Sequence, residues 1–166
     1  MKKTMITAFA ITVILMGIFF SGCEKKEETM DDTVYELEDK IADFYYTYEN
    51  INYNAFYQRY RFYTDGDRKF FFHEQRQVKD DYGPTSEKDV TRKGEYELND
   101  QEWKKFVSML DKGTYRNRQE SAESGDSGPW LYIYLKKDPS KQLEFSFPSY
   151  GELKDFEAYC EKLASR

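Results

Sequence analysis

Aromatic and polar positions alternate through the first half of this chain. Over residues 41–49, Phe44, Tyr46 and Tyr48 occupy every second position, a period of two that predicts a strand. The segment before it has a competing signal. Val34, Leu37 and Ile41 are spaced as on one face of a helix, so 33–40 remains open between helix and strand.

A β-hairpin is predicted next. Two runs rich in Phe, Tyr and Arg, 55–64 and 68–78, flank the tripeptide Asp65-Gly66-Asp67, and Asp-Gly between alternating runs is a strong hairpin signal. In the first run Arg59 and Arg61 are expected to face outward. Three aromatic side chains are expected to face inward: Phe56, Tyr60 and Phe62. In the second run Phe70 and Phe72 point one way and His73 the other.

The second half of the chain predicts shorter strands around polar connections. Residues 79–88 form a polar loop with Gly83-Pro84, and the serine- and glycine-rich stretch 120–128 is a second loop. The predicted strands are 89–98, 114–119, and a hairpin of 130–135 with 142–147 around Asp138-Pro139-Ser140.

Two amphipathic helices are predicted, at about 99–112 and 149–164. Asn99 with Glu102, and Ser149 with Glu152, have the spacing of a capping box. Gly113 is expected to end the first helix in a left-handed conformation. The apolar stripes follow helical spacing: Trp103, Phe106, Val107 and Leu110 in the first helix, and Leu153, Phe156, Cys160 and Leu163 in the second.

The order of these elements favours an α+β fold. We expect a mostly antiparallel sheet of about five or six strands, with both helices packed on one face, in a single domain over 41–166. Leu, Ile and Val are scarce, but the chain has 15 Tyr and 13 Phe. Aromatic side chains bury about 150–250 Å² each, enough to build a core from few aliphatic residues.

The N-terminus has the order of features of a secretory signal. Lys2 and Lys3 precede an apolar run over 5–20, which is short for a membrane-spanning helix, and Ser21 and Gly22 are small. The run Phe20-Ser21-Gly22-Cys23 resembles the lipobox of bacterial lipoproteins, although Phe20 stands where that family usually has leucine or another aliphatic residue.

That resemblance implies cleavage between Gly22 and Cys23 and a diacylglyceryl group, with palmitate as an acyl chain, on the Cys23 thiol. Residues 1–22 would be the signal peptide, and residues 23–40 the lipidated cysteine with a charged tether. Two acyl chains suffice for stable anchoring. The protein would then lie at the cell membrane, facing outward from the cytoplasm. The alternative is an uncleaved N-terminal anchor, which gives the same orientation.

Charge argues against several partners. The net charge is −6, and loss of two positive charges, Lys2 and Lys3, with the signal makes it −8. An acidic body is repelled by nucleic-acid phosphates and by anionic lipids. We therefore expect no nucleic-acid partner.

One segment resembles a catalytic motif. Gly125-Asp126-Ser127-Gly128-Pro129 is similar to the sequence around the nucleophile of chymotrypsin-like serine proteases, which would make Ser127 the nucleophile of a small cell-surface hydrolase. Such an enzyme needs a histidine base. His73 is the only histidine, and it lacks the Ala-Ala-His-Cys context of that family. A polar loop before a strand explains the segment without catalysis.

The other reactive side chains suggest structural roles. His73 has no cysteine or second histidine nearby to complete a transition-metal site, so a solvent-facing strand histidine is expected. Cys160 falls on the apolar stripe of the second helix, which favours a buried thiol over a nucleophile. No cofactor and no metal are predicted.

The aromatic excess suggests a binding surface on the sheet. Exposed tyrosines beside arginines make adaptable contacts with proteins, peptides or glycans. Phe71 is expected on the same outward face as this candidate surface. The residues of the surface are Tyr45, Tyr57, Arg59, Arg61, Tyr63, Tyr132 and Tyr134. The sequence therefore favours a non-catalytic, membrane-anchored binding module over the hydrolase, unless both sheet faces are covered.

Overall fold

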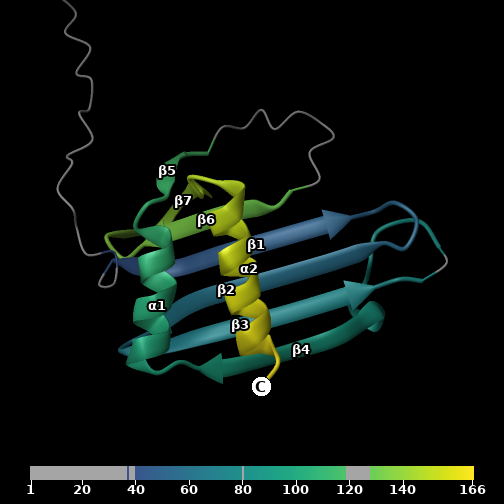
Figure 1. Cartoon of the computed structure of the whole chain (residues 1–166), viewed down its shortest axis with the longest axis horizontal. Coiled ribbons are helices and arrows are strands. Elements are labelled where there is room, and N and C mark those ends of the chain that lie inside the picture. The colour runs from purple at the N-terminus through teal and green to yellow at the C-terminus, as the bar shows by residue number, and fades with distance from the viewer. Residues whose placement is uncertain (1–36, 38–39, 80, 119–127) are drawn as a thin grey trace, which may run out of the picture. The chain divides into compact units, whose positions relative to one another are not determined.

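The strands of the computed structural model are β1 (Ile41–Asn50), β2 (Phe56–Asp65), β3 (Arg68–Gln77), β4 (Val90–Glu97), β5 (Thr114–Asn117), β6 (Trp130–Leu135) and β7 (Asp138–Ser146). They form one antiparallel sheet in the order β4-β3-β2-β1-β6-β7-β5 (Figure 1). The structure describes residues 37, 40–79, 81–118 and 128–166. The α+β prediction is confirmed, with seven strands where about five or six were expected.

Two tight turns join strands that are neighbours both in the sequence and in the sheet. Asp65 pairs with Arg68 across the β2–β3 turn, and Gly66 adopts a positive φ of 59° there, a conformation that glycine enters without steric cost. Leu135 pairs with Asp138 at the β6–β7 turn. That turn therefore precedes the Asp138-Pro139-Ser140 segment on which it was predicted, and β7 begins earlier than 142.

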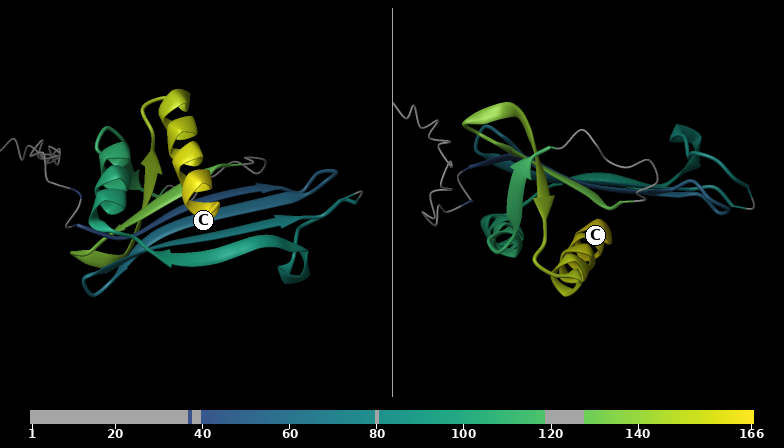
Figure 2. Two further views of the ribbon diagram at one scale, coloured as in Figure 1. Left: turned by 60° about the horizontal axis from the view of Figure 1, so that its bottom comes forward. Right: turned by 90° about the horizontal axis from the view of Figure 1, so that it is seen from above.

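Helices α1 (Asp100–Leu110) and α2 (Tyr150–Ala164) lie on the same face of the sheet (Figure 2). The capping box of α1 is confirmed, because Asn99 and Glu102 each accept a hydrogen bond from the other's backbone N–H at 3.0 Å. The Ser149 hydroxyl likewise accepts from the Glu152 N–H. The caps satisfy amides that the helices leave unpaired, and so fix where each helix starts.

Aromatic rings fill the layer between the sheet and the helices. The fully buried Phe44 ring lies 5.5–5.6 Å, edge to face, from the rings of Phe106, Phe145 and Phe156. Phe62 stacks on Phe106, with 3.9 Å between ring centroids and 3° between ring planes. Aromatic pairs add about 0.5–1.5 kcal/mol each beyond the area they bury, so this cluster joins both helices to the central strands.

The expected left-handed stop at Gly113 is wrong. The glycines with positive φ in the described ranges are Gly66, Gly83 and Gly128. Gly113 is needed for a different reason: a Cβ atom there would lie 2.1 Å from the Cζ atom of Phe145. The chain leaving α1 passes over the edge of a core ring, and only glycine leaves room for it.

Neither helix in the described part of the chain is long and apolar enough to cross a membrane.

We expect Gly113→Ala to lower the free energy of unfolding by about 1–3 kcal/mol, because the added methyl group overpacks the core against Phe145. Urea denaturation followed by circular dichroism measures this. The matched control is Gly151→Ala in α2, where the new Cβ meets only the Ser149 hydroxyl at 3.7 Å. There the free energy should stay unchanged or rise by up to about 1 kcal/mol. Equal effects of the two substitutions would contradict the packing role of Gly113.

Candidate binding surface on the open sheet face

The face of the sheet opposite α1 and α2, called the open face below, carries no helix in the described residues except the short turn η2 (Glu87–Asp89) (Figure 2). All seven residues of the predicted surface project from this face, and all are partly buried. Their placement follows from strand register: Tyr45 of β1 pairs with Tyr132 of β6 and with Arg61 of β2. Cross-strand partners share a face, so these three side chains form one row.

Guanidinium groups lie against the tyrosine rings of the open face. The Arg61 guanidinium carbon is 4.3 Å from the centroid of the Tyr63 ring and 5.1 Å from that of Tyr45. The same guanidinium pairs with the Asp43 carboxylate at 2.5 Å, and this hydrogen bond raises the pKa of Arg61. Cation–π contacts contribute about 0.5–2 kcal/mol each. Together with the ion pair they hold the outward side chains in fixed positions.

Three tyrosines of this surface, Tyr45, Tyr57 and Tyr63, have raised pKa values. Burial raises the pKa of Tyr45 and of Tyr57. Burial and a hydrogen bond donated to Glu95 at 2.6 Å raise the pKa of Tyr63 to about 12. A phenol has one O–H donor, and that of Tyr63 is already used by Glu95, whereas that of Tyr57 can donate to a partner's carbonyl or carboxylate.

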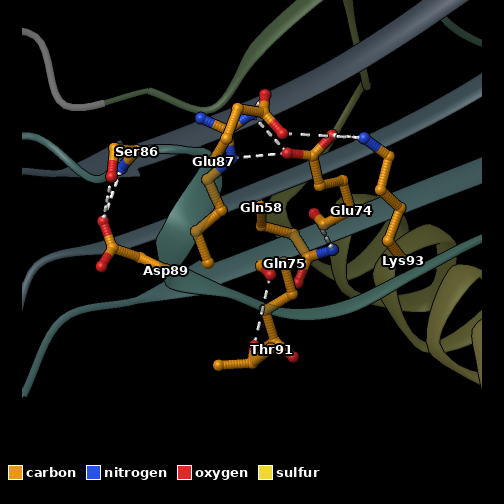
Figure 3. Close-up of polar contacts among 9 residues, drawn as sticks. Gln58, Glu74, Gln75, Ser86, Glu87, Asp89, Thr91 and Lys93 are labelled. Carbon is orange, nitrogen blue, oxygen red and sulfur yellow. Dashed lines mark hydrogen bonds and ion pairs between the residues drawn. The ribbon is translucent and has the colours of Figure 1, made fainter.

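A buried carboxylate organises the β3–β4 side of the open face (Figure 3). Glu74 is 3% exposed. Its carboxylate accepts from Arg76 at 2.5 Å and lies 3.4 Å from the Lys93 ammonium. Glu87 of η2 also pairs with Arg76 and Lys93. The two cations compensate the buried charge, as burial in low dielectric demands, and they attach η2 to the sheet.

Arg59 is the exception in this pattern. Register places it opposite Glu74 on β3 and opposite Thr47 on β1. No carboxylate of the described residues pairs with Arg59, and its Nε atom is buried without a hydrogen-bond partner. Its guanidinium carbon lies 5.9 Å from the Tyr45 ring centroid.

A shallow pocket of about 400 Å³ opens near the β6–β7 turn. It is lined by Ala42, Asp43, Tyr45, Thr64, Tyr134 and Pro139. The rings of Tyr45 and Tyr134 meet edge to face, with 5.8 Å between centroids. The pocket continues the tyrosine surface and combines aromatic edges with the Asp43 carboxylate.

Two predicted orientations are wrong. Phe71 was expected on the outward face, but it is fully buried under the helices. His73 was expected to face solvent, but it is 1% exposed. The reason is the hairpin register, which pairs Phe71 with Phe62 and His73 with Tyr60 and so places all four on the helix side. The open-face aromatics of β3 are instead Phe70 and Phe72.

Burial makes His73 unsuitable as a general base. Its ring lies between the rings of Phe71 and Tyr96, with centroids 6.0 Å and 5.9 Å away. Neither ring nitrogen has a hydrogen-bond partner in the described part of the structure. Burial, together with the positive charge of Arg92, lowers the pKa of His73 from its ordinary value of 6.5, although Glu161 opposes the shift.

Polar contacts between α2 and the sheet were not foreseen from the sequence. The Tyr46 hydroxyl donates to Glu157 at 2.7 Å, and Glu161 accepts from Tyr60 and, at 2.6 Å, from Arg92. Burial and the bond to Glu157 raise the pKa of Tyr46. The only sequence signal was the i, i+4 spacing of the two glutamates, which puts them on one face of α2.

The remaining candidate residues divide into two groups. Cys160 is fully buried, so the predicted buried thiol is confirmed, and burial raises the pKa of the thiol well above the usual value. Gly22, Cys23 and Ser127 lie outside the described residues. Within the described ranges, no three His, Cys, Asp or Glu side chains are grouped as metal ligands would be.

We expect the free energy of unfolding to fall as the pH drops below about 6.5, because the unfolded chain then binds a proton that the folded His73 site resists. The slope should not exceed about 1.4 kcal/mol per pH unit, the limit for one proton. His73→Phe keeps an aromatic ring in the stack and should flatten the profile between pH 6.5 and about 5. The control is Tyr150→Phe, which removes an exposed phenol. An unchanged slope in His73→Phe would contradict this interpretation.

Comparison with protein-family models, with curated proteins and with solved structures found no match to this chain.

Proposed function

We propose that this protein is a non-catalytic binding module, anchored by lipid at the outer side of the cytoplasmic membrane, that recognises an extracytoplasmic partner through the open face. The observation that carries this proposal is the row of tyrosines and arginines on a sheet face that the described helices leave uncovered. Tyr and Arg are the residues that dominate binding energy in protein interfaces.

Preorganisation supports this role for the open face. A partner pays less entropy when the side chains it meets are already ordered. Arg61 is held by Asp43 and two tyrosine rings, and Arg76 is held by Glu74 and lies 5.0 Å from the Tyr57 ring centroid. Each tyrosine is only partly buried, so part of each side chain remains accessible.

The N-terminal sequence supports the membrane location. The order of charge, apolar run, small pair and Cys23 is that of a lipoprotein signal, and a diacylglyceryl group supplies two chains, enough for stable attachment. The charged residues after Cys23 suit a solvated tether. The domain would then be displayed in front of the membrane with its binding face free.

Metabolic labelling with an alkyne fatty acid tests the anchor. The full chain should incorporate the probe, and Cys23→Ala should lose it completely, because only that thiol is proposed to carry lipid. Cys160→Ala is the matched control, since it removes the other cysteine and should keep the label. Label retained in Cys23→Ala would refute lipid attachment at this residue.

Photocrosslinking in cells tests the surface. The photoreactive amino acid p-benzoylphenylalanine in place of Tyr132, on the open face, should give a discrete crosslinked product, because its ring meets the bound partner. The matched control replaces Tyr150, which lies on α2 and is 72% exposed, and should give no such product. Products from the α2 position alone would overturn the open face as the binding surface.

A further inference from the structure

Arg59 differs from the neighbouring cations of the open face. The other cations there that have carboxylate partners form these pairs: Arg61 with Asp43, Arg68 with Glu97, Arg76 and Lys93 with Glu74, and Arg116 with Glu144. Arg59 has no such partner among the described residues. Arg118, which lies over the Tyr132 ring, has none there either, but it donates to the Gln142 side chain at 2.9 Å. The reason for Arg59 is local: the carboxylate directly opposite it, Glu74, is already bound by Arg76 and Lys93.

This arrangement leaves the Arg59 guanidinium without a carboxylate at ion-pair distance among the described residues, although Glu74 lies opposite it on β3. A guanidinium presents its N–H donors in a fixed planar fork, which matches a carboxylate. Thr47, opposite Arg59 on β1, has a short side chain and supplies no negative charge. A group that brings a carboxylate to Arg59 would complete the charge pattern that its neighbours already have.

We propose that Arg59 binds a carboxylate of an acidic segment of another protein that docks on the open face. This inference rests on the proposed function, because it assumes that the open face is the binding surface. It adds the chemistry of the partner: aspartate or glutamate side chains that reach Arg59 between the rows of tyrosines.

The neighbouring side chains favour a peptide over a sugar chain. Guanidinium groups already lie over the rings of Tyr45, Tyr57 and Tyr63, at 4.3–5.1 Å from the nearest guanidinium carbon to each centroid. These contacts engage ring faces that a sugar would need for stacking. The Tyr63 hydroxyl is already donated to Glu95. The groups left for a partner are the other phenol hydroxyls, such as that of Tyr57, and the N–H donors of Arg59, which suit the carbonyls and carboxylates of an acidic peptide.

An anionic membrane fits the observations less well than a protein. The net charge of the chain is −6, and a lipid surface meets the field of the whole acidic body. A peptide segment can instead contact the region around Arg59 alone, within about one Debye length of 8–10 Å. Binding of the docked segment should therefore weaken markedly as the salt concentration rises. The rest of the partner protein need not contact this domain.

The probe is a random copolymer of glutamate and tyrosine, titrated into the full-length protein in detergent at about 0.05 M and about 0.3 M salt. Wild type should bind it, more weakly at the higher salt. Arg59→Gln should weaken binding by about tenfold or more, and Arg59→Lys should recover part of the loss. Lys104→Gln, on the exposed side of α1, makes the same charge change and should stay within about twofold of wild type.

Melting temperature provides the folding control. Arg59→Gln should melt within a few degrees of wild type, because the guanidinium has no ion pair to lose and its Nε is unsatisfied, while its contact with the Tyr45 ring at 5.9 Å is lost. The proposal would be overturned if the wild-type protein did not bind the copolymer, or if Arg59→Gln and Lys104→Gln bound it with equal affinity. Polygalacturonate binding that depends equally on Arg59 would replace the peptide by an anionic polysaccharide. A dimer that Arg59→Gln converts to monomer would replace it by a second copy.

Crosslinking at Tyr132 separates the two proposals. If the open face gives a product whose yield does not depend on Arg59, the binding surface stands and the acidic partner is refuted. If the open face gives no product, the binding surface fails and this inference fails with it.

Discussion

The contact of both helices with the central strands decides what each face of the sheet can do. Phe44 meets Phe106 of α1 and Phe156 of α2 edge to face, so a single β1 side chain joins both helices to the sheet. Because side chains alternate along a strand, burying Phe44 forces Asp43 and Tyr45 to the other side. The open face is therefore a consequence of how the core is built.

Charge on the open face is arranged in local pairs. Asp43 binds Arg61, and Glu74 is shared by Arg76 and Lys93. Such pairing permits charged side chains to lie half-buried among aromatic rings, since an unpaired charge there is costly. It also distributes the carboxylates so that Arg59 is left without one. An acidic protein can in this way present a local positive group to a partner.

Local patterns in the sequence predicted the elements and most of their orientations. Period two gave β1 and the β2–β3 hairpin, and the capping residues Asn99 and Ser149 gave both helix starts. The error at Phe71 and His73 was avoidable. The Asp-Gly turn sets the register of the hairpin, and with Tyr60 and Phe62 facing inward their cross-strand partners must face inward as well.

The sequence by itself determined the periodicities, the caps and the outward direction of Arg59 and Arg61, because each depends on residues close together along the chain. The tertiary structure decided which face of the sheet the helices cover, why only glycine fits at position 113 against the Phe145 ring, and which cations Glu74 binds. Most of these outcomes depend on contacts between residues far apart in the sequence, such as Tyr46 with Glu157 and Gly113 with Phe145, set by packing and register across the sheet. Composition could supply many arginines, but only the geometry of the neighbouring strands shows that Arg59 lacks a carboxylate partner.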